Sequence, residues 1–230
     1  MDYILAGIQD AFALLLAADA DVYEIAGISV FVALVATLLA TLVGIPVGFL
    51  VATRSFRGHR AVIVVLNTLL ALPTVVVGLV VYALLSRRGP FGFFSLLYTP
   101  EAMIIGETIL AIPIVAVFSL SALRSVDPRV SETAFTLGAT QRQIVWATLL
   151  EARFGLLAAV VASFGRVIAE VGIAMMLGGN IKGSTRTLTT AIALETSKGE
   201  FGMAIALGGI LLAVAFAANI LFHWLQGFGE

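Results

Sequence analysis

Arg166 and Glu170 are the residues best placed to do chemistry, because they are the only charges in an apolar stretch at residues 154–179. Residues four apart share one face of a helix, so the two side chains can form an ion pair. A lone charge at membrane depth is costly, so we expect the pair to face protein rather than lipid. Either Arg166 adds positive potential to an anion path and Glu170 holds it, or the pair only braces the helix.

A second candidate is the segment GGNIKGSTRT at residues 178–187, which combines glycine, lysine and hydroxyl side chains. Gly178 and Gly183 have the spacing of a phosphate-binding loop, but Ser184 stands where the lysine belongs. We therefore expect no nucleotide-binding motif and no enzyme activity in this chain. We expect a flexible extracellular turn here; the alternative is that backbone amides, with Lys182, offer an external oxyanion a donor-rich mouth.

The sequence lacks the residues that other kinds of site would need. No cysteine and two distant histidines argue against disulfide scaffolds, thiol catalysis and the usual zinc sites, so we expect no metal or cofactor. A membrane-embedded hydrolase would need a base beside Ser163, but His59 lies in a loop and His223 near the C-terminus. With 13 basic and 14 acidic residues, the chain has no polybasic surface for nucleic acid.

The elements that must position these residues are membrane spans. Of 230 residues, 60% are hydrophobic and 12% charged, and the mean hydropathy is +1.09, so lipid is the expected solvent. Gaps between charges predict an all-α polytopic membrane protein with one transmembrane domain at residues 26–229. The five predicted transmembrane helices cover about residues 26–52, 61–86, 102–123, 154–179 and 201–225.

Residues 1–25 are predicted to form a separate, external segment. Apolar residues recur at helical spacing within residues 3–18, with Asp10 on the other side, which favours an N-terminal interfacial helix over a sixth span. The loops at 53–60 and 124–153 carry seven arginines, against five basic residues on the opposite side. The positive-inside rule therefore predicts an outside N-terminus and a cytoplasmic C-terminus.

The first three spans carry packing and bending signals. Prolines 46, 73 and 113 each remove a backbone hydrogen bond and predict kinks. The first span also has a stripe of small side chains that lets another helix approach closely. The stripe consists of Ala33, Thr37, Thr41, Gly44, Gly48 and Ala52.

The loop at residues 124–153 is too structured to be a linker. Asp127 before Pro128 predicts a helix start, and Gly138 predicts its end. Thr140 can cap a second helix that runs toward the next span. The pattern predicts a rigid knob on the cytoplasmic face.

This loop resembles the EAA loop of ABC importer permeases. Glu132, Ala134 and Gly138 match the motif, whose coupling helix docks on the ATPase subunit. The sequence departs from it at Thr133, where the family has alanine, and at residues 148–151, which read TLLE instead of Ile-x-Leu-Pro.

The resemblance extends over nearly the whole chain. Residues 66–92 and 165–196 are similar to permeases of the tungstate family and, more distantly, to those of molybdate importers. The second block is the more specific. Its matching positions are Glu170, Gly172, Met176, Gly179, Asn180, Ile181, Gly183, Thr187, Leu188, Ala191 and Ile192.

The resemblance implies the permease subunit of a type I ATP-driven importer of tungstate, with molybdate as the alternative substrate. Its expected partners are membrane lipid, a second copy of itself, two ABC ATPase subunits and an extracytoplasmic oxyanion-binding protein. The rival class is an ion-coupled secondary transporter that uses Glu107 and Glu170 to carry protons. That class shows no repeat symmetry here and leaves the knob without a purpose.

Overall fold

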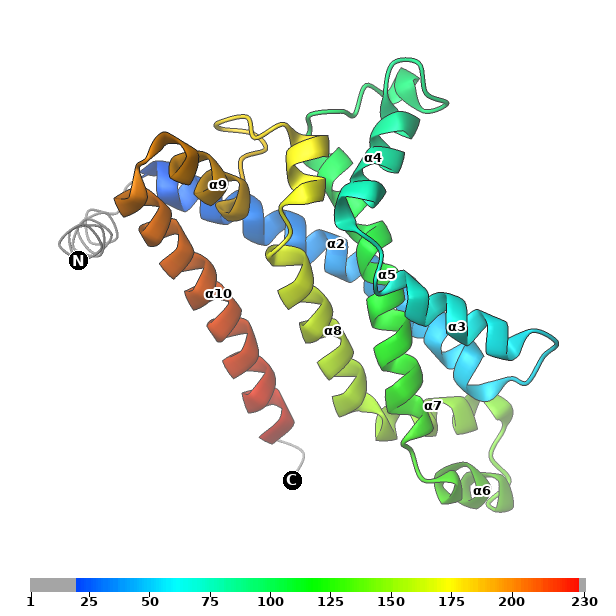
Figure 1. Ribbon diagram of the computed structural model, residues 1–230. Helices are drawn as coiled ribbons and strands as arrows, with labels where there is room; N and C mark the ends of the chain where they lie inside the picture. Colours follow the sequence, from blue (N-terminus) through cyan, green and yellow to red (C-terminus); the bar gives the residue numbers. More distant parts are fainter. Residues whose placement is uncertain (1–19, 228–230) are drawn as a thin grey trace.

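The computed structural model describes residues 20–227, and every regular element in that range is helical. The predicted all-α fold class is confirmed. The interfacial helix expected within residues 3–18 lies outside the described residues. The elements, in chain order, are α2 (Ala20–Thr53), α3 (His59–Leu69), α4 (Thr74–Leu85), the 3-10 turn η1 (Gly92–Phe94), α5 (Pro100–Arg124), α6 (Pro128–Thr136), α7 (Gln141–Glu151), α8 (Arg153–Ile168), the π-helical turn η2 (Ala174–Gly178), α9 (Leu188–Lys198) and α10 (Phe201–Gly227) (Figure 1).

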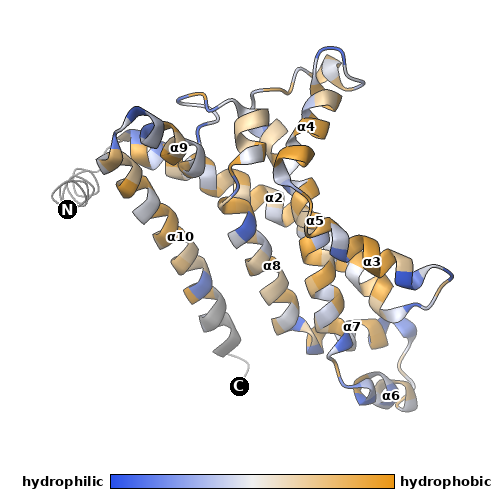
Figure 2. Ribbon diagram, in the orientation of Figure 1, coloured by the Kyte–Doolittle hydropathy of each residue, from blue (hydrophilic) through white to orange (hydrophobic). Residues whose placement is uncertain are grey.

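Three unbroken helices are long and apolar enough to cross a membrane: α2, α5 and α10. The pair α3 and α4 meets the same test only together and is bent by 97°, and the pair α7 and α8 is bent by 62°. Residues 20–227 therefore contain three candidate spans, or up to five if each bent pair counts as one. Apolar residues occupy most of the length of these helices, and many polar residues lie at or near their ends (Figure 2).

α2 begins earlier than the charge pattern indicates. The boundary predicted at residue 25 falls inside this continuous helix, which starts at Ala20. Asp21 and Glu24 close the charge-free window in the sequence, yet acidic residues suit the positive end of a helix dipole. Asp21 also forms an ion pair with Lys182 in the distant loop before α9.

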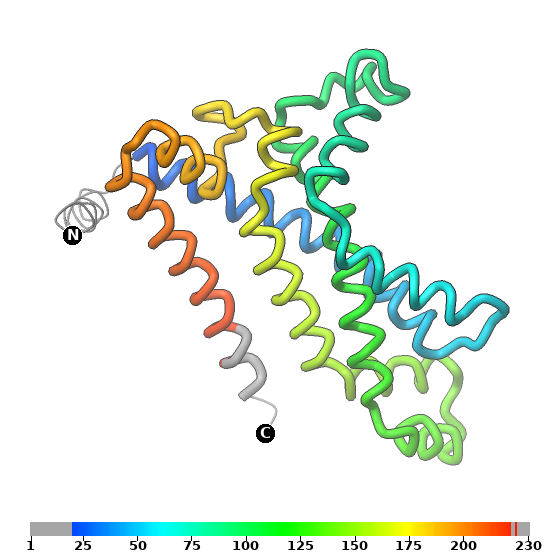
Figure 3. The backbone as a smooth tube through the Cα atoms, viewed as in Figure 1, coloured from blue at the N-terminus to red at the C-terminus, as the bar shows by residue number. Residues whose placement is uncertain are grey.

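The three prolines have unequal effects. Pro46 and Pro113 lie inside α2 and α5, which continue past them. At Pro73 the chain instead leaves α3 through a short turn, in which Leu72 N donates to Leu69 O at 3.3 Å, and then turns into α4. The predicted kink at residue 73 is therefore a sharp corner, clear in the tube of Figure 3.

The predicted fourth span at residues 154–179 is not one helix. α8 ends at Ile168, and residues 169–171 are non-helical before the chain coils again into η2. Arg166 therefore lies in the last turn of α8 rather than near the middle of a continuous span. The side chain of Glu170 competes for the backbone amides that would continue the helix, as described below.

The core is built on the contact between α2 and α5. Gly44 and Gly48 of the predicted stripe are buried here, and a Cβ on Gly44 would lie 2.7 Å from Val115 Cβ. A Cβ on Gly48 would lie 2.7 Å from the carbonyl oxygen of Ala116. The two backbones therefore approach as closely as small residues permit.

Gly48→Val is expected to destabilise the fold by about 1–3 kcal/mol, because the added side chain forces α2 away from α5. The measurement is the thermal unfolding of the purified protein. Gly27→Val is the matched control: it lies in the same helix and carries the same helix-propensity cost, but a Cβ there meets nothing within 4 Å. Equal unfolding temperatures for both variants would contradict the close contact.

Candidate functional site

The first candidate region is the knob, which we define as α6 and α7 with the turn between them. Asp127 Oδ1 accepts a hydrogen bond from Arg129 N at 2.9 Å, and Pro128 occupies the first turn of α6. Gly138 has φ +78°, a left-handed conformation that ends the helix at little cost only for glycine. The predicted start and end of this helix are confirmed.

The second helix of the knob starts with the predicted cap. Thr140 N donates to Gln143 Oε1 at 2.7 Å, and the two residues form a capping box at the start of α7. α7 then turns by 62° into α8 at the buried Ala152. The knob therefore continues into the helix that carries Arg166.

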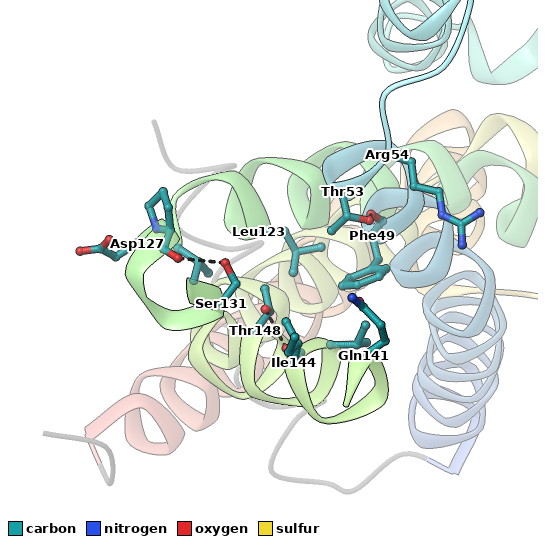
Figure 4. A pocket seen from close by; sticks show the side chains of 12 residues that line it. Phe49, Thr53, Arg54, Leu123, Asp127, Ser131, Gln141, Ile144 and Thr148 are labelled. Atoms are coloured by element: carbon teal, nitrogen blue, oxygen red, sulfur yellow. Dashed lines mark hydrogen bonds between the residues drawn. The ribbon is translucent and has the colours of Figure 1, made fainter. Parts of the chain in front are cut away.

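The knob also seats against the ends of two candidate spans. A groove of about 470 Å³ separates it from α2 and α5, and side chains from all four helices converge on it (Figure 4). Beneath it, Leu123 of α5 and Leu156 of α8 share a buried apolar cluster, against which Phe49 of α2 packs. Leu149 of α7 packs on the same cluster, so the knob contacts the ends of α5 and α8 through it.

The outer surface of the knob is apolar where a surface should be polar. Leu137 is 81% exposed and Phe135 is 68% exposed. Glu132 is exposed beside them, whereas Ala134 is partly buried. Exposed apolar side chains rimmed by charge are typical of a protein interface. The sequence analysis did not identify Phe135. The feature that could have revealed it is the presence of one aromatic residue in a short helix with many polar residues.

The second candidate region is the break segment, residues 169–187, which connects α8 to α9. Arg166 Nη1 donates to Glu170 Oε2 at 2.7 Å, so the expected ion pair forms. The side chain of Arg166 is 43% exposed and that of Glu170 only 3%. The arginine thus reaches out of the protein while the carboxylate stays inside.

Glu170 holds the break segment together. Its Oε1 accepts hydrogen bonds from Gly172 N at 2.9 Å and Ile173 N at 3.3 Å. Thr189 Oγ1, at the start of α9, donates to the carbonyl oxygen of Glu170 at 2.7 Å. The carboxylate therefore caps the helical turn that follows it, which explains why α8 stops at Ile168.

The two breaks in the fold lie side by side. A Cβ on Gly172 would lie 3.1 Å from Thr74 Oγ1, at the start of α4, and 3.1 Å from Val75 Cγ2. One turn on, a Cβ on Gly78 would lie 3.1 Å from Met176 Sδ in η2. Gly172 therefore lets the corner before α4 approach the break after α8.

Glu107 of α5 lies near the break segment, because a Cβ on its neighbour Gly106 would lie 2.6 Å from Ile173 Cγ2, in the turn that Glu170 caps. It is only 3% exposed, and its Oε2 has no hydrogen-bond partner within residues 20–227. The two carboxyl groups that the sequence analysis named together as possible proton carriers are therefore both buried, whereas Arg166 is partly exposed. The proximity of Glu107 to the break segment had no signal in the sequence, because α5 and the break segment are far apart along the chain.

The rest of the break segment is held by several internal hydrogen bonds, although residues 181–183 at its tip are exposed. Gly179, Asn180 and Gly183 all have positive φ, and they fold the loop back on itself. Thr185 Oγ1 donates to Gly178 O at 2.5 Å and accepts from Ile181 N at 3.0 Å.

Internal bonds also use donors on which the predicted oxyanion mouth depends. Asn180 Oδ1 accepts from Thr190 Oγ1 at 3.0 Å and from Arg186 Nε at 3.2 Å. Lys182 is paired with Asp21. Sequence reasoning missed the buried threonines, whose only signal was the hydroxyl-rich run STRTLTT at residues 184–190.

Ser163 has no base beside it. Its Oγ is buried and finds no hydrogen-bond partner in the part of the chain that the structure describes. His59 lies at the start of α3, where its Nε2 accepts from Arg124 Nη2 at 3.1 Å. The arrangement gives no support to a hydrolase.

The fold places the chain in a known structural class. It is similar to the membrane subunit of the MetNI methionine ABC transporter in an inward-facing conformation, with a TM-score of 0.68. That likeness covers 98% of this chain and 95% of the other at 19% identity, so it speaks for the fold alone. The molecule has the fold of a type I ABC importer permease.

Sequence similarity then gives the family. Residues 44–227 match the model for the binding-protein-dependent transport system inner membrane component, and the chain belongs to this family of multi-pass membrane proteins. It is 43% identical to a tungstate uptake system permease protein of Peptoclostridium acidaminophilum, over 98% of this chain and 99% of that one. It is 45% identical to a probable anion ABC transporter permease of Haloferax volcanii, over 86% and 88% of the two chains. Nothing in these comparisons supports the ion-coupled alternative.

Glu170→Ala is expected to cost about 1–3 kcal/mol of stability, because it leaves buried amides of the break segment without an acceptor. Glu170→Gln keeps an amide oxygen at the same place and should cost less. The measurement is the thermal unfolding of both variants against wild type. If the two variants unfold alike, the carboxylate does not cap the segment.

Proposed function

We propose that this chain forms the translocation pathway of an ATP-driven tungstate importer and couples that pathway to a separate ATPase subunit. The observation that carries the coupling role is the knob, which exposes apolar side chains and packs through Leu149 on the buried cluster of Leu123, Ala152 and Leu156. The substrate is inferred from the tungstate permease that is 43% identical over nearly the full length of both chains. Molybdate is the alternative oxyanion.

The coupling step follows from the connections of the knob. An ATPase subunit that binds Leu137, Phe135 and Glu132 would move α6 and α7 together as a rigid body. Leu149 of α7 packs on the buried cluster of Leu123 and Leu156, which would transfer this motion to α5 and α8, and the joint at Ala152 continues directly into α8. α8 ends at the break segment, so movement of the knob changes the position of Arg166 relative to the corner before α4.

Arg166 and Glu170 have different roles in this proposal. Glu170 braces the break segment, as its buried contacts indicate, and it holds Arg166 in one orientation. Arg166 is 43% exposed and presents its remaining donors toward a passing anion. The glycines of the motif, Gly172, Gly179 and Gly183, allow the tight folding that this brace needs.

The assembly that fits this chain has two copies of it, two ATPase subunits and an extracytoplasmic oxyanion-binding protein. The knob would face the cytoplasm, with the N-terminus outside and the C-terminus inside. Selectivity between tungstate and molybdate would come mainly from the binding protein.

Gly138→Pro is expected to lower co-purification of the ATPase subunit by roughly tenfold or more, which corresponds to about 1.4 kcal/mol of binding free energy. Proline cannot adopt φ +78° and removes the N–H that donates to Phe135 O, so the end of α6 is distorted. The measurement is the amount of ATPase subunit retained by the tagged permease, with ATP-driven tungstate uptake by the reconstituted complex as a second readout.

Gly199→Pro is the matched control, because Gly199 also ends a helix with a positive φ of +85° but lies after α9, far along the chain from the knob. This variant should retain the ATPase subunit. Uptake by the purified chain that continues without ATP and stops when the proton gradient collapses would overturn the proposed function.

Arg166→Met, Glu170→Gln and the double variant separate the brace from the pathway role. We expect the double variant to fold, because no buried charge is left unpaired, and to lose at least about tenfold in uptake rate, or about 1.4 kcal/mol. The measurements are folded yield and uptake at fixed ATPase content. A double variant with wild-type folding and uptake would remove both roles.

A further inference from the structure

Three arginines gather where the α2–α3 loop meets the end of α5. Arg57 and Arg60 are exposed on the loop and the first turn of α3, and Arg124 is exposed at the end of α5. None of them forms an ion pair with a carboxylate among the described residues. This surface therefore carries positive charge that the described part of the fold does not neutralise.

A pocket accompanies the charge. A hollow of about 580 Å³ is lined by Phe56, His59, Arg60, Ile63 and Arg124. Phe56 stacks on the His59 ring with centroids 5.3 Å apart, and Arg124 donates to His59 Nε2. These contacts hold Arg124 and the imidazole in fixed positions beside the exposed arginine of α3.

α3 continues from the arginines with an apolar outer face. Val64 is 63% exposed and Val65 is 54% exposed, while Leu66 on the opposite face is buried against α5. Asn67 and Thr68 are exposed too, but their side chains donate to the carbonyl oxygens four residues back. The outer face of α3 thus presents few free polar groups, as a surface in contact with lipid requires.

The corner before α4 fixes how α3 lies. The two helices meet at 97°, so if α4 follows the membrane normal, α3 lies nearly in the membrane plane (Figure 3). Its arginine end is on the same side of the molecule as the knob (Figure 1). A helix with an apolar outer face and arginines at one end is the form of an interfacial membrane contact.

We propose that α3 is an interfacial helix and that Arg60 and Arg124, the two arginines that line the pocket, bind the phosphate of an anionic phospholipid in the cytoplasmic leaflet. Arginine suits this ligand because its planar guanidinium donates two parallel hydrogen bonds to phosphate oxygens. A lipid, rather than a free phosphate ion, fits because Ile63 of the pocket is followed in α3 by the exposed Val64 and Val65, which can cover an acyl chain. The cytoplasmic location rests on the proposed function, whereas lipid binding itself does not.

The test compares two pairs of arginines in the complex of the permease with its ATPase, reconstituted in nanodiscs of mixed phosphatidylglycerol and phosphatidylcholine. Arg60→Gln with Arg124→Gln removes the two charges that line the pocket. Arg87→Gln with Arg88→Gln removes two charges from the loop after α4 and is the matched control. Native mass spectrometry counts the phosphatidylglycerol that stays bound.

We expect the first pair of substitutions to reduce retained phosphatidylglycerol about threefold and the control to leave it unchanged, with tungstate uptake measured in parallel. Equal losses in both variants would overturn the site, since they would reflect general attraction of anionic lipid. Displacement by soluble glycerol phosphate at the same concentration as the lipid would overturn the lipid as ligand. Unchanged lipid with loss of the ATPase subunit would assign the arginines to that contact instead. Failure of ATP-driven uptake in the wild-type complex, with lipid retention intact, would overturn the proposed function alone.

Discussion

The rest of this structure depends on the hydrogen bonds and the ion pair that the carboxylate of Glu170 forms. At membrane depth, each backbone amide that leaves a helix must find a partner in the protein, because lipid offers none. The chain interrupts its fourth apolar stretch after Ile168, and Glu170 supplies the missing acceptor to Gly172 N and Ile173 N. Arg166 balances the charge of the carboxylate, and Thr189 ties its backbone to α9. Without these contacts the break would expose several unsatisfied amides.

Because of the position of this break, α8 connects the knob to a second region of the fold. α8 connects the two regions directly, with the knob at one end and the break segment at the other. The start of α4 packs closely against Gly172, so a shift of α8 would also displace the α3–α4 pair. Close-packed interfaces of this kind switch between discrete arrangements rather than deform smoothly. Under the proposed function, a small movement of the knob would therefore become a rearrangement near Arg166.

The sequence predicted the local features of the fold better than those that depend on distant contacts. Asp127, Gly138 and Thr140 were read correctly because caps depend on a few neighbouring residues. The charge gaps located the apolar stretches, but they could not reveal that residues 154–179 are interrupted. That break depends on the bond from Thr189, 19 residues away, and on the approach of α4. The closeness of Glu107 to the break segment was hidden for the same reason.

The way in which the break segment uses its polar groups also limits where an anion can bind. The hydroxyl of Thr185 bonds within the segment, and that of Thr190 bonds to Asn180, so neither is free to form a cage around a dianion. The remaining donors of Arg166 are partly exposed, but Glu170 offsets much of their charge. A transporter gains from this weakness, because conduction needs sites that are favourable enough to enter and shallow enough to leave. If Arg166 lies on the path, as we propose, an unpaired arginine there would hold an oxyanion too tightly, so the carboxylate that braces the fold would also weaken anion binding.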